Sequence, residues 1–136
     1  IETTKLGDFV GEQTSKTIEK VKQEGFTPIL IGDGEIIEKQ YPEKGSKLTG
    51  ESVVLLKTEG QTTLPDFTGW SKKNILSFKM LSGLDIRITG DGYVTGQSLS
   101  AGTITSLDDP IVIHLQRPSE VYKVDEEDEE DQIMGG

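Results

Sequence analysis

The chain has 136 residues, no cysteine, a single histidine (His114) and a formal net charge of -10. That length holds one ordinary domain or two very small ones, and the lack of cysteine excludes a disulfide scaffold, a thiolate metal site and a cysteine nucleophile. One histidine cannot supply a zinc site that needs two imidazoles, and it disfavours a Ser-His-Asp triad.

An internal repeat organises the chain, because turn and core residues return at a nearly fixed interval. Eight residues have an identical counterpart 58 positions later: Leu6, Asp8, Phe9, Gly11, Gly25, Gly32, Asp33 and Gly34 match Leu64, Asp66, Phe67, Gly69, Gly83, Gly90, Asp91 and Gly92. Gln40 and Gly45 match Gln97 and Gly102 at an interval of 57. We therefore expect a first repeat over residues 1–59, a second over 60–117, and a tail over 118–136.

Each repeat is expected to begin with a short extended segment, followed by one helix and three strands. In the first repeat, Gly25 ends the helix, and residues 26–31 form the next strand. Pro28 lacks a backbone N–H and so predicts that this strand is an edge or is irregular. Gly32-Asp33-Gly34 then supplies turn residues, and Val53 to Lys57 form the last strand.

The second repeat carries clearer helix signals. Ser71 is a plausible N-cap, Trp70 and Ile75 have the spacing of a hydrophobic staple, and Gly83 suits a left-handed C-cap. Alternation over residues 84–89 and 111–115 predicts strands with one buried face, and it places His114 on the outward phase. The fold class is therefore α+β, with each repeat packing one helix on a three-stranded antiparallel sheet.

The helix of the second repeat has too many apolar residues for one small sheet. They spread around much of its circumference: Ile75, Leu76, Phe78, Met80 and Leu81. A helix on one sheet buries a single stripe. We therefore predict an inter-domain contact through Leu76, Phe78 and Met80, made either with the first repeat or with an upstream domain.

Charge is concentrated at the C-terminal end, where residues 125–131 are seven consecutive carboxylates. Such a block is typical of a solvated, disordered tail and argues against nucleic acid as a partner. No apolar run approaches the roughly 18 residues of a membrane span. The chain does not begin with methionine, so the lack of a targeting segment says nothing about a longer parent protein.

Two residues are candidates for ligand binding, each with a structural alternative. Trp70 has a flat face that could stack on a sugar, but its place in the staple explains it without a ligand. Arg87 could pair with a carboxylate of a muropeptide or of a neighbouring domain, although a plain surface cation is the commoner case. The sequence offers no metal site and calls for no cofactor, and the Gly-Asp-Gly segments have neither Walker nor Rossmann spacing.

These motifs resemble the PASTA domain of penicillin-binding proteins and serine/threonine kinases of Gram-positive bacteria. Leu64-Pro65-Asp66-Phe67-Thr68-Gly69-Trp70-Ser71 resembles the opening of the family, and Gln40-Tyr41-Pro42-Glu43-Lys44-Gly45 resembles the segment before its last strand. Gly7 and Leu99 depart from the family pattern, each replacing a proline. Two short copies are most similar to the C-terminal pair of a class B penicillin-binding protein.

That resemblance implies a non-catalytic pair that docks and stabilises a division D,D-transpeptidase at the extracellular face of a Gram-positive membrane. The partners implied are the upstream transpeptidase domain, peptidoglycan or muropeptide, and divisome proteins. No catalytic residue is expected here, because the chain contains neither Ser-x-x-Lys nor Ser-x-Asn. The alternative implied by the same family is the extracellular, muropeptide-sensing region of a PASTA kinase.

Overall fold

The computed structural model describes residues 3–50, 52–105 and 108–118. The predicted acidic tail lies outside these ranges except for Pro118. Searched over the described residues, the chain has no helix of the length and apolarity that a membrane crossing requires.

The two repeats have the same order of elements. The first contains β1 (Thr4–Lys5), α1 (Thr14–Gln23), β2 (Thr27–Ile31), β3 (Lys39–Tyr41), β4 (Lys47–Leu48) and β5 (Val53–Lys57). The second contains β6 (Thr62–Thr63), α2 (Lys72–Ser82), β7 (Ile86–Thr89), β8 (Tyr93–Gln97), β9 (Ile104–Thr105) and β10 (Ile111–Gln116). One helix and one three-stranded sheet per repeat confirm the α+β class, and the β1–β4 and β6–β9 ribbons are additions to it.

The three-stranded sheets are mixed, so the prediction of purely antiparallel sheets was wrong. In each sheet the last strand of the repeat lies in the centre, in the orders β2-β5-β3 and β7-β10-β8. The central strand is parallel to the strand after the helix and antiparallel to the other. Side chains alternate with the same period in parallel and antiparallel strands, so the sequence pattern carried no information on direction. Pro28 does lie on an edge strand, as predicted.

The predicted signals at the ends of α2 are confirmed. Ser71 is the N-cap, and its Oγ accepts a hydrogen bond from the Asn74 N–H at 3.2 Å. Gly83 ends the helix in the left-handed region at φ 72°, where a residue with a Cβ is strained. These caps satisfy backbone groups that the helix leaves unpaired, and they fix where α2 begins and ends.

An equivalent glutamine holds the opening segment of each repeat. Gln40 Oε1 accepts from the Phe9 N–H at 2.7 Å, and Gln97 Oε1 accepts from the Phe67 N–H at 2.9 Å. Their amide nitrogens each donate to two backbone carbonyls, those of Gly7 and Pro42 and those of Pro65 and Leu99. The two glutamines that the sequence repeat aligned therefore make the same set of hydrogen bonds.

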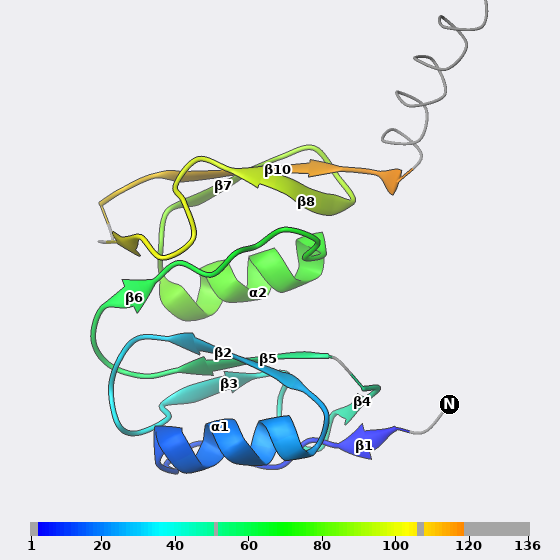
Figure 1. Ribbon diagram of the computed structural model, residues 1–136, viewed down its shortest axis with the longest axis vertical. Helices are drawn as coiled ribbons and strands as arrows, with labels where there is room; N and C mark the ends of the chain where they lie inside the picture. Colours follow the sequence, from blue (N-terminus) through cyan, green and yellow to red (C-terminus); the bar gives the residue numbers. More distant parts are fainter. Residues whose placement is uncertain (1–2, 51, 106–107, 119–136) are drawn as a thin grey trace, which may run out of the picture.

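The elements stack in four layers, in the order α1, first sheet, α2 and second sheet (Figure 1). The helix α2 thus lies between the two sheets. One cluster of buried side chains spans both repeats, joining Ile31 and Leu55 of the first to Phe67, Ile75 and Phe78 of the second. Because α2 contributes to covering the first sheet as well as its own, the repeats share a hydrophobic core.

The central strands of the two sheets differ in how many of their faces are buried. In β5, Leu55 joins the shared cluster, while its neighbour Leu56 points to the other face and packs with Val21 and Phe26 in the core of the first repeat. In β10, residues 111, 113 and 115 are buried, but His114 and Gln116 are exposed. The first sheet is therefore covered on both faces and the second on one.

Candidate docking surface at the seam between the repeats

The exposed side of α2 forms a shallow groove against the first repeat, here called the seam groove. Its lining residues are Tyr41, Lys72, Lys73, Leu76, Ser77 and Met80, and its volume is about 480 Å³. Leu76 is 48% exposed and Met80 is 72% exposed. These two apolar side chains therefore face outward next to two lysines, a combination suited to an apolar partner surface with a carboxylate rim.

The structure separates the three residues predicted to make an inter-domain contact. Phe78 is fully buried in the cluster that joins α2 to the first sheet, so it lies at the boundary between the repeats. Leu76 and Met80 lie on the opposite, open side of the helix. Their contact with a further domain stays a prediction, since this chain alone does not test it.

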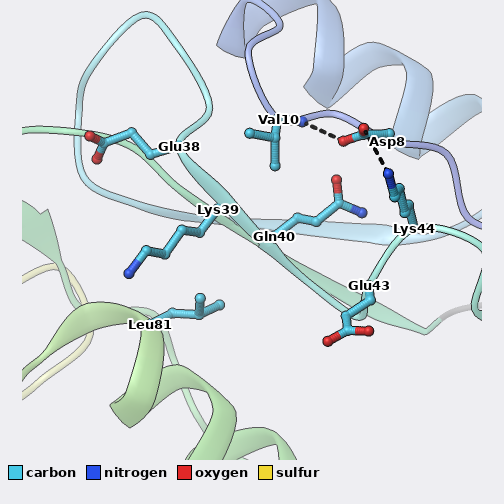
Figure 2. A pocket seen from close by; sticks show the side chains of 8 residues that line it. All are labelled: Asp8, Val10, Glu38, Lys39, Gln40, Glu43, Lys44 and Leu81. Atoms are coloured by element: carbon cyan, nitrogen blue, oxygen red, sulfur yellow. Dashed lines mark hydrogen bonds and ion pairs between the residues drawn. The ribbon is translucent and has the colours of Figure 1, made fainter.

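Figure 2 shows a second cavity, of about 460 Å³. It adjoins the seam groove, because Gln40 and Leu81 of its lining are the chain neighbours of Tyr41 and Met80 of the groove. The first repeat contributes most of its lining, and Leu81 of α2 closes one side: the residues are Asp8, Val10, Glu38, Lys39, Gln40, Glu43, Lys44 and Leu81. Asp8 accepts a hydrogen bond from the Val10 N–H at 3.2 Å and lies 3.9 Å from Lys44 Nζ. Its lining combines charges of both signs with the apolar side chains of Val10 and Leu81, which suits a zwitterionic group better than a simple ion.

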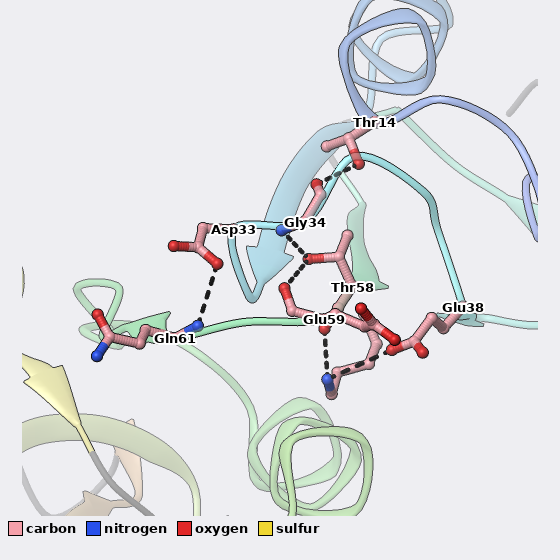
Figure 3. A network of polar contacts seen from close by, with 8 residues as sticks. Thr14, Asp33, Gly34, Glu38, Thr58, Glu59 and Gln61 are labelled. Atoms are coloured by element: carbon pink, nitrogen blue, oxygen red, sulfur yellow. Dashed lines mark hydrogen bonds and ion pairs between the residues drawn. The ribbon is translucent and has the colours of Figure 1, made fainter.

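The linker between the repeats is bound to the Gly32-Asp33-Gly34 turn (Figure 3). Asp33 Oδ1 accepts from the Gln61 N–H at 3.1 Å, and the Asp33 N–H donates to the Glu59 carbonyl at 3.0 Å. The buried Thr58 hydroxyl accepts from the Gly34 N–H at 2.9 Å. The predicted turn at Gly32-Asp33-Gly34 therefore also holds the chain that leads into the second repeat.

Close packing explains the glycines at this linker. A Cβ on Gly32 would lie 2.5 Å from the Thr58 carbonyl oxygen, and a Cβ on Gly60 would lie 1.6 Å from Asp33 Oδ1. Both residues also have positive φ, 111° and 102°. The sequence repeat had marked Gly32 as a turn residue, but Gly60 has no such signal because its partner is far away in the chain.

The equivalent turn of the second repeat anchors the start of α2 instead of a linker. Asp91 Oδ1 accepts from Lys72 Nζ at 2.8 Å, and Asp91 Oδ2 lies 3.9 Å from Arg117. The hydrogen bond from Lys72, together with its positive charge, lowers the pKa of Asp91 below the ordinary 3.8. In the opening segment, hydrogen bonds from Thr68 lower the pKa of Asp66 in the same way.

Trp70 and Arg87, the predicted ligand-binding residues, do not converge on the seam groove or on the cavity beside it. The Trp70 ring is half-buried and packs edge to face on Phe67 and Phe78, at centroid distances of 5.0 and 5.9 Å. Arg87 is exposed and pairs with Asp85, Nη2 to Oδ2, at 3.1 Å. Both thus have structural partners, and ligand binding by either stays a prediction.

Two further side chains that could carry chemistry, His114 and Ser71, have structural partners. Among the residues that the structure describes, no three His, Asp or Glu side chains are grouped so that they could hold a metal ion. His114 lies on the open face of the second sheet, and its Nδ1 hydrogen-bonds the hydroxyl of Thr89, its cross-strand partner. The Ser71 hydroxyl is engaged as the cap of α2. The groove and the cavity along the seam are two hollows to which α2 and the first repeat both contribute lining residues.

The profile of the PASTA domain matches this chain twice, over residues 4–60 and 62–117, and the chain belongs to the PASTA domain family. It carries two such domains in tandem. Penicillin binding protein 2X from Streptococcus thermophilus is a similar solved structure, with 32% identity and a TM-score of 0.69. The match covers 85% of this chain and 17% of that protein, so the chain spans about a sixth of that relative's length.

Kinase structures also match, with weaker similarity. The three-PASTA-domain region of a Ser/Thr kinase from Staphylococcus aureus is 17% identical, with a TM-score of 0.33, over 86% of this chain and 67% of that one. The entire extracellular region of the kinase PrkC from the same organism is 18% identical, with a TM-score of 0.35, over 80% and 45%. No curated protein sequence matches the chain.

Proposed function

We propose that this tandem pair is the non-catalytic part of a penicillin-binding protein, where it docks and stabilises a peptidoglycan transpeptidase. The observation that carries the proposal is the similarity to penicillin binding protein 2X, which extends over both repeats at 32% identity. On this proposal the catalytic serine belongs to an upstream domain of a longer chain. The pair then acts at the extracellular face of a Gram-positive membrane, in septal wall synthesis.

The contacts between the two repeats support a docking role. The shared cluster around Phe78 and the hydrogen bonds between Asp33 and the linker both oppose rotation of one repeat against the other. A surface that spans both repeats, such as the seam groove, is therefore preorganised, and preorganisation reduces the entropy lost on binding. Two flexibly joined modules would lack this property.

The seam groove is the proposed contact with the transpeptidase domain or with divisome proteins. Leu76 and Met80 supply apolar area, and Lys73 makes no ion pair among the residues that the structure describes. We expect the partner to present apolar side chains bordered by carboxylates. The cavity beside the groove is lined by acidic and basic side chains. A muropeptide stem, which also carries positive and negative charges, could bind there weakly.

A kinase-type sensor is the rival function, and the environment of Trp70 argues against it. A sensor that stacks a sugar on this ring needs an accessible ring face near convergent polar groups. Here the ring packs edge to face with two phenylalanines and lines neither cavity of the seam. The docking proposal requires no ligand at Trp70, which agrees with the packing of its ring in the core.

A charge placed in the groove tests docking. Met80→Lys should weaken association of the pair with the rest of the longer protein while leaving the pair folded, because Met80 is already 72% exposed. The matched control is Ile104→Lys, which changes an apolar side chain that is 61% exposed on β9, outside the groove. Hydrogen exchange of α2, measured with and without the upstream domains, gives the readout. Equal protection in both states, or docking that survives Met80→Lys, contradicts the proposal.

The assignment of catalysis to an upstream domain has its own test. The 136-residue chain should form no covalent adduct with a labelled penicillin, because it lacks the Ser-x-x-Lys pair of nucleophile and base. Stoichiometric labelling of this chain would place the nucleophile here and overturn that assignment.

A further inference from the structure

The β1–β4 ribbon of the first repeat holds two lysines directly opposite each other. In its antiparallel register Thr4 pairs with Leu48 and Lys5 with Lys47, and both lysines are exposed. Neither lysine forms an ion pair with any residue that the structure describes. Like charges at directly opposed positions destabilise a strand pair. The lysine pair, as we call Lys5 and Lys47, therefore reduces the stability of the ribbon that carries it.

The fold itself does not require this pair. The matching β6–β9 ribbon of the second repeat has Thr63 opposite Ile104 at the same register, and both side chains are again exposed. Two neutral residues thus form the same ribbon within one chain. The unfavourable choice in the first repeat calls for an anionic group that neutralises both lysines.

The same chain carries a segment of the complementary charge. Residues 125–131 are seven consecutive carboxylates, which begin seven positions after Pro118. Extended chain covers about 3.3 Å per residue, so this block can begin about 23 Å from Pro118 and end about 43 Å from it. In the view of Figure 1, β10 ends on the same side of the molecule as β1 and β4, with the end of β10 in the upper part of the view and the ribbon in the lower part.

We propose that the acidic segment 125–131 binds back onto the lysine pair. Lys44, in the turn that precedes β4, adds a third positive charge, since its contact with Asp8 is long at 3.9 Å. Tethering keeps the segment at an effective concentration in the mM range, so individually weak ion pairs suffice to populate the bound state. Any anionic partner of the ribbon must then displace the chain's own acidic segment. This inference does not depend on the proposed function.

A spin label locates the segment, because the absence of cysteine makes Gln132→Cys a unique attachment point. In the 136-residue chain with a nitroxide at that position, the amide signals of Lys5 and Lys47 should lose most of their intensity. Those of Thr63 and Ile104 should not, which makes the second ribbon an internal control. Raising the ionic strength from about 0.1 M to about 1 M shortens the Debye length from about 10 Å to about 3 Å and should restore the signals.

The double variant Lys5→Thr/Lys47→Ile gives the first ribbon the pair found in the second. It should abolish the loss of signal, whereas Lys16→Thr/Lys22→Ile, which removes two exposed lysines of α1, should leave it unchanged. Deletion of residues 119–136 gives a second measurement that needs no label. It should lower the unfolding midpoint of the parent chain but not that of Lys5→Thr/Lys47→Ile.

Four results would each overturn the proposal. Equal loss of signal at both ribbons, or loss that persists in Lys5→Thr/Lys47→Ile, shows that the lysine pair is not the binding site. Loss centred on Leu76 and Met80 places the segment in the seam groove instead. If spin-labelled chains cause the loss of signal in separate isotope-labelled chains of a mixture, the segment that binds the ribbon belongs to a second copy of the chain.

Discussion

Adjacent leucines on β5 allow the shared core to be tested by a matched pair of substitutions. Leu55 is 1% exposed and packs with Phe67 and Phe78 of the second repeat, whereas Leu56 is 0% exposed and packs with Val21 and Phe26 of the first. Both substitutions to alanine remove the same atoms from the same strand. Each should lower the free energy of unfolding by about 2–5 kcal/mol, the usual range for a fully buried leucine.

The two variants differ in what they do to the second repeat. The cavity left by Leu55→Ala opens into the cluster that contains the ring partners of Trp70, the only tryptophan of the chain. Trp70 fluorescence should therefore report the loss directly, although the substitution lies in the other repeat. Leu56→Ala should affect Trp70 only through the cooperative unfolding of the pair.

Denaturant unfolding followed by Trp70 fluorescence and by far-ultraviolet circular dichroism gives the readout. In the parent chain the two transitions should coincide, as expected for one cooperative unit. A Trp70 transition that Leu55→Ala leaves in place, while the circular dichroism transition moves, would show that the repeats fold independently and would refute the shared core.

Three further predictions concern single contacts. In Gly60→Ala the new Cβ meets Asp33 Oδ1, which accepts the hydrogen bond from the Gln61 N–H, so the amide resonance of Gln61 should shift. The control Gly102→Ala has φ 89° and open space around the new Cβ, so it should cost only backbone strain of roughly 1–3 kcal/mol. Gln97→Glu keeps the acceptor for the Phe67 N–H but loses both donated hydrogen bonds, so urea unfolding should show a loss of about 1–3 kcal/mol that the exposed control Gln116→Glu lacks. The folded-state pKa of Asp91 is lowered, so the Asp91 carboxylate should stabilise the fold, relative to Asp91→Asn, above pH 3.8. This stabilisation should disappear as the pH falls through the lowered pKa. If the pKa of Asp91 does not rise in Lys72→Gln, the contact with Lys72 is not the cause of the shift.

The local sequence predicted the repeat, the two ends of α2 and a position for Pro28 on an edge or irregular strand. It did not predict the start of α1, where Gln13 is the N-cap without a side-chain cap hydrogen bond. The predicted features depend on near neighbours: a serine three residues before the N–H it caps, a glycine at the left-handed position, a proline without a donor. The paired glutamines were also visible as repeat partners. Their identical hydrogen bonds follow from the same local geometry being built twice.

The last strands of the two repeats also differ in their apolar pattern. Residues 53–56 of the first repeat are continuously apolar, whereas 111–116 of the second alternate, with His114 at the position of Leu56. Continuous apolar residues are typical of a strand buried on both faces. This contrast predicts that the first sheet is covered on both faces and the second on one.

The strand directions, the place of α2 between the sheets and the path of the linker follow from long-range packing and are seen only in the folded structure. Alternation has the same period in either strand direction, and an amphipathic pattern says that a face is buried without naming the surface that covers it. Asp33 and Gln61 are 28 residues apart, and Lys5 and Lys47 meet only through strand pairing. Contacts of this kind form between residues distant in the chain, so no local pattern records them, and they decide which surfaces this protein presents to a partner.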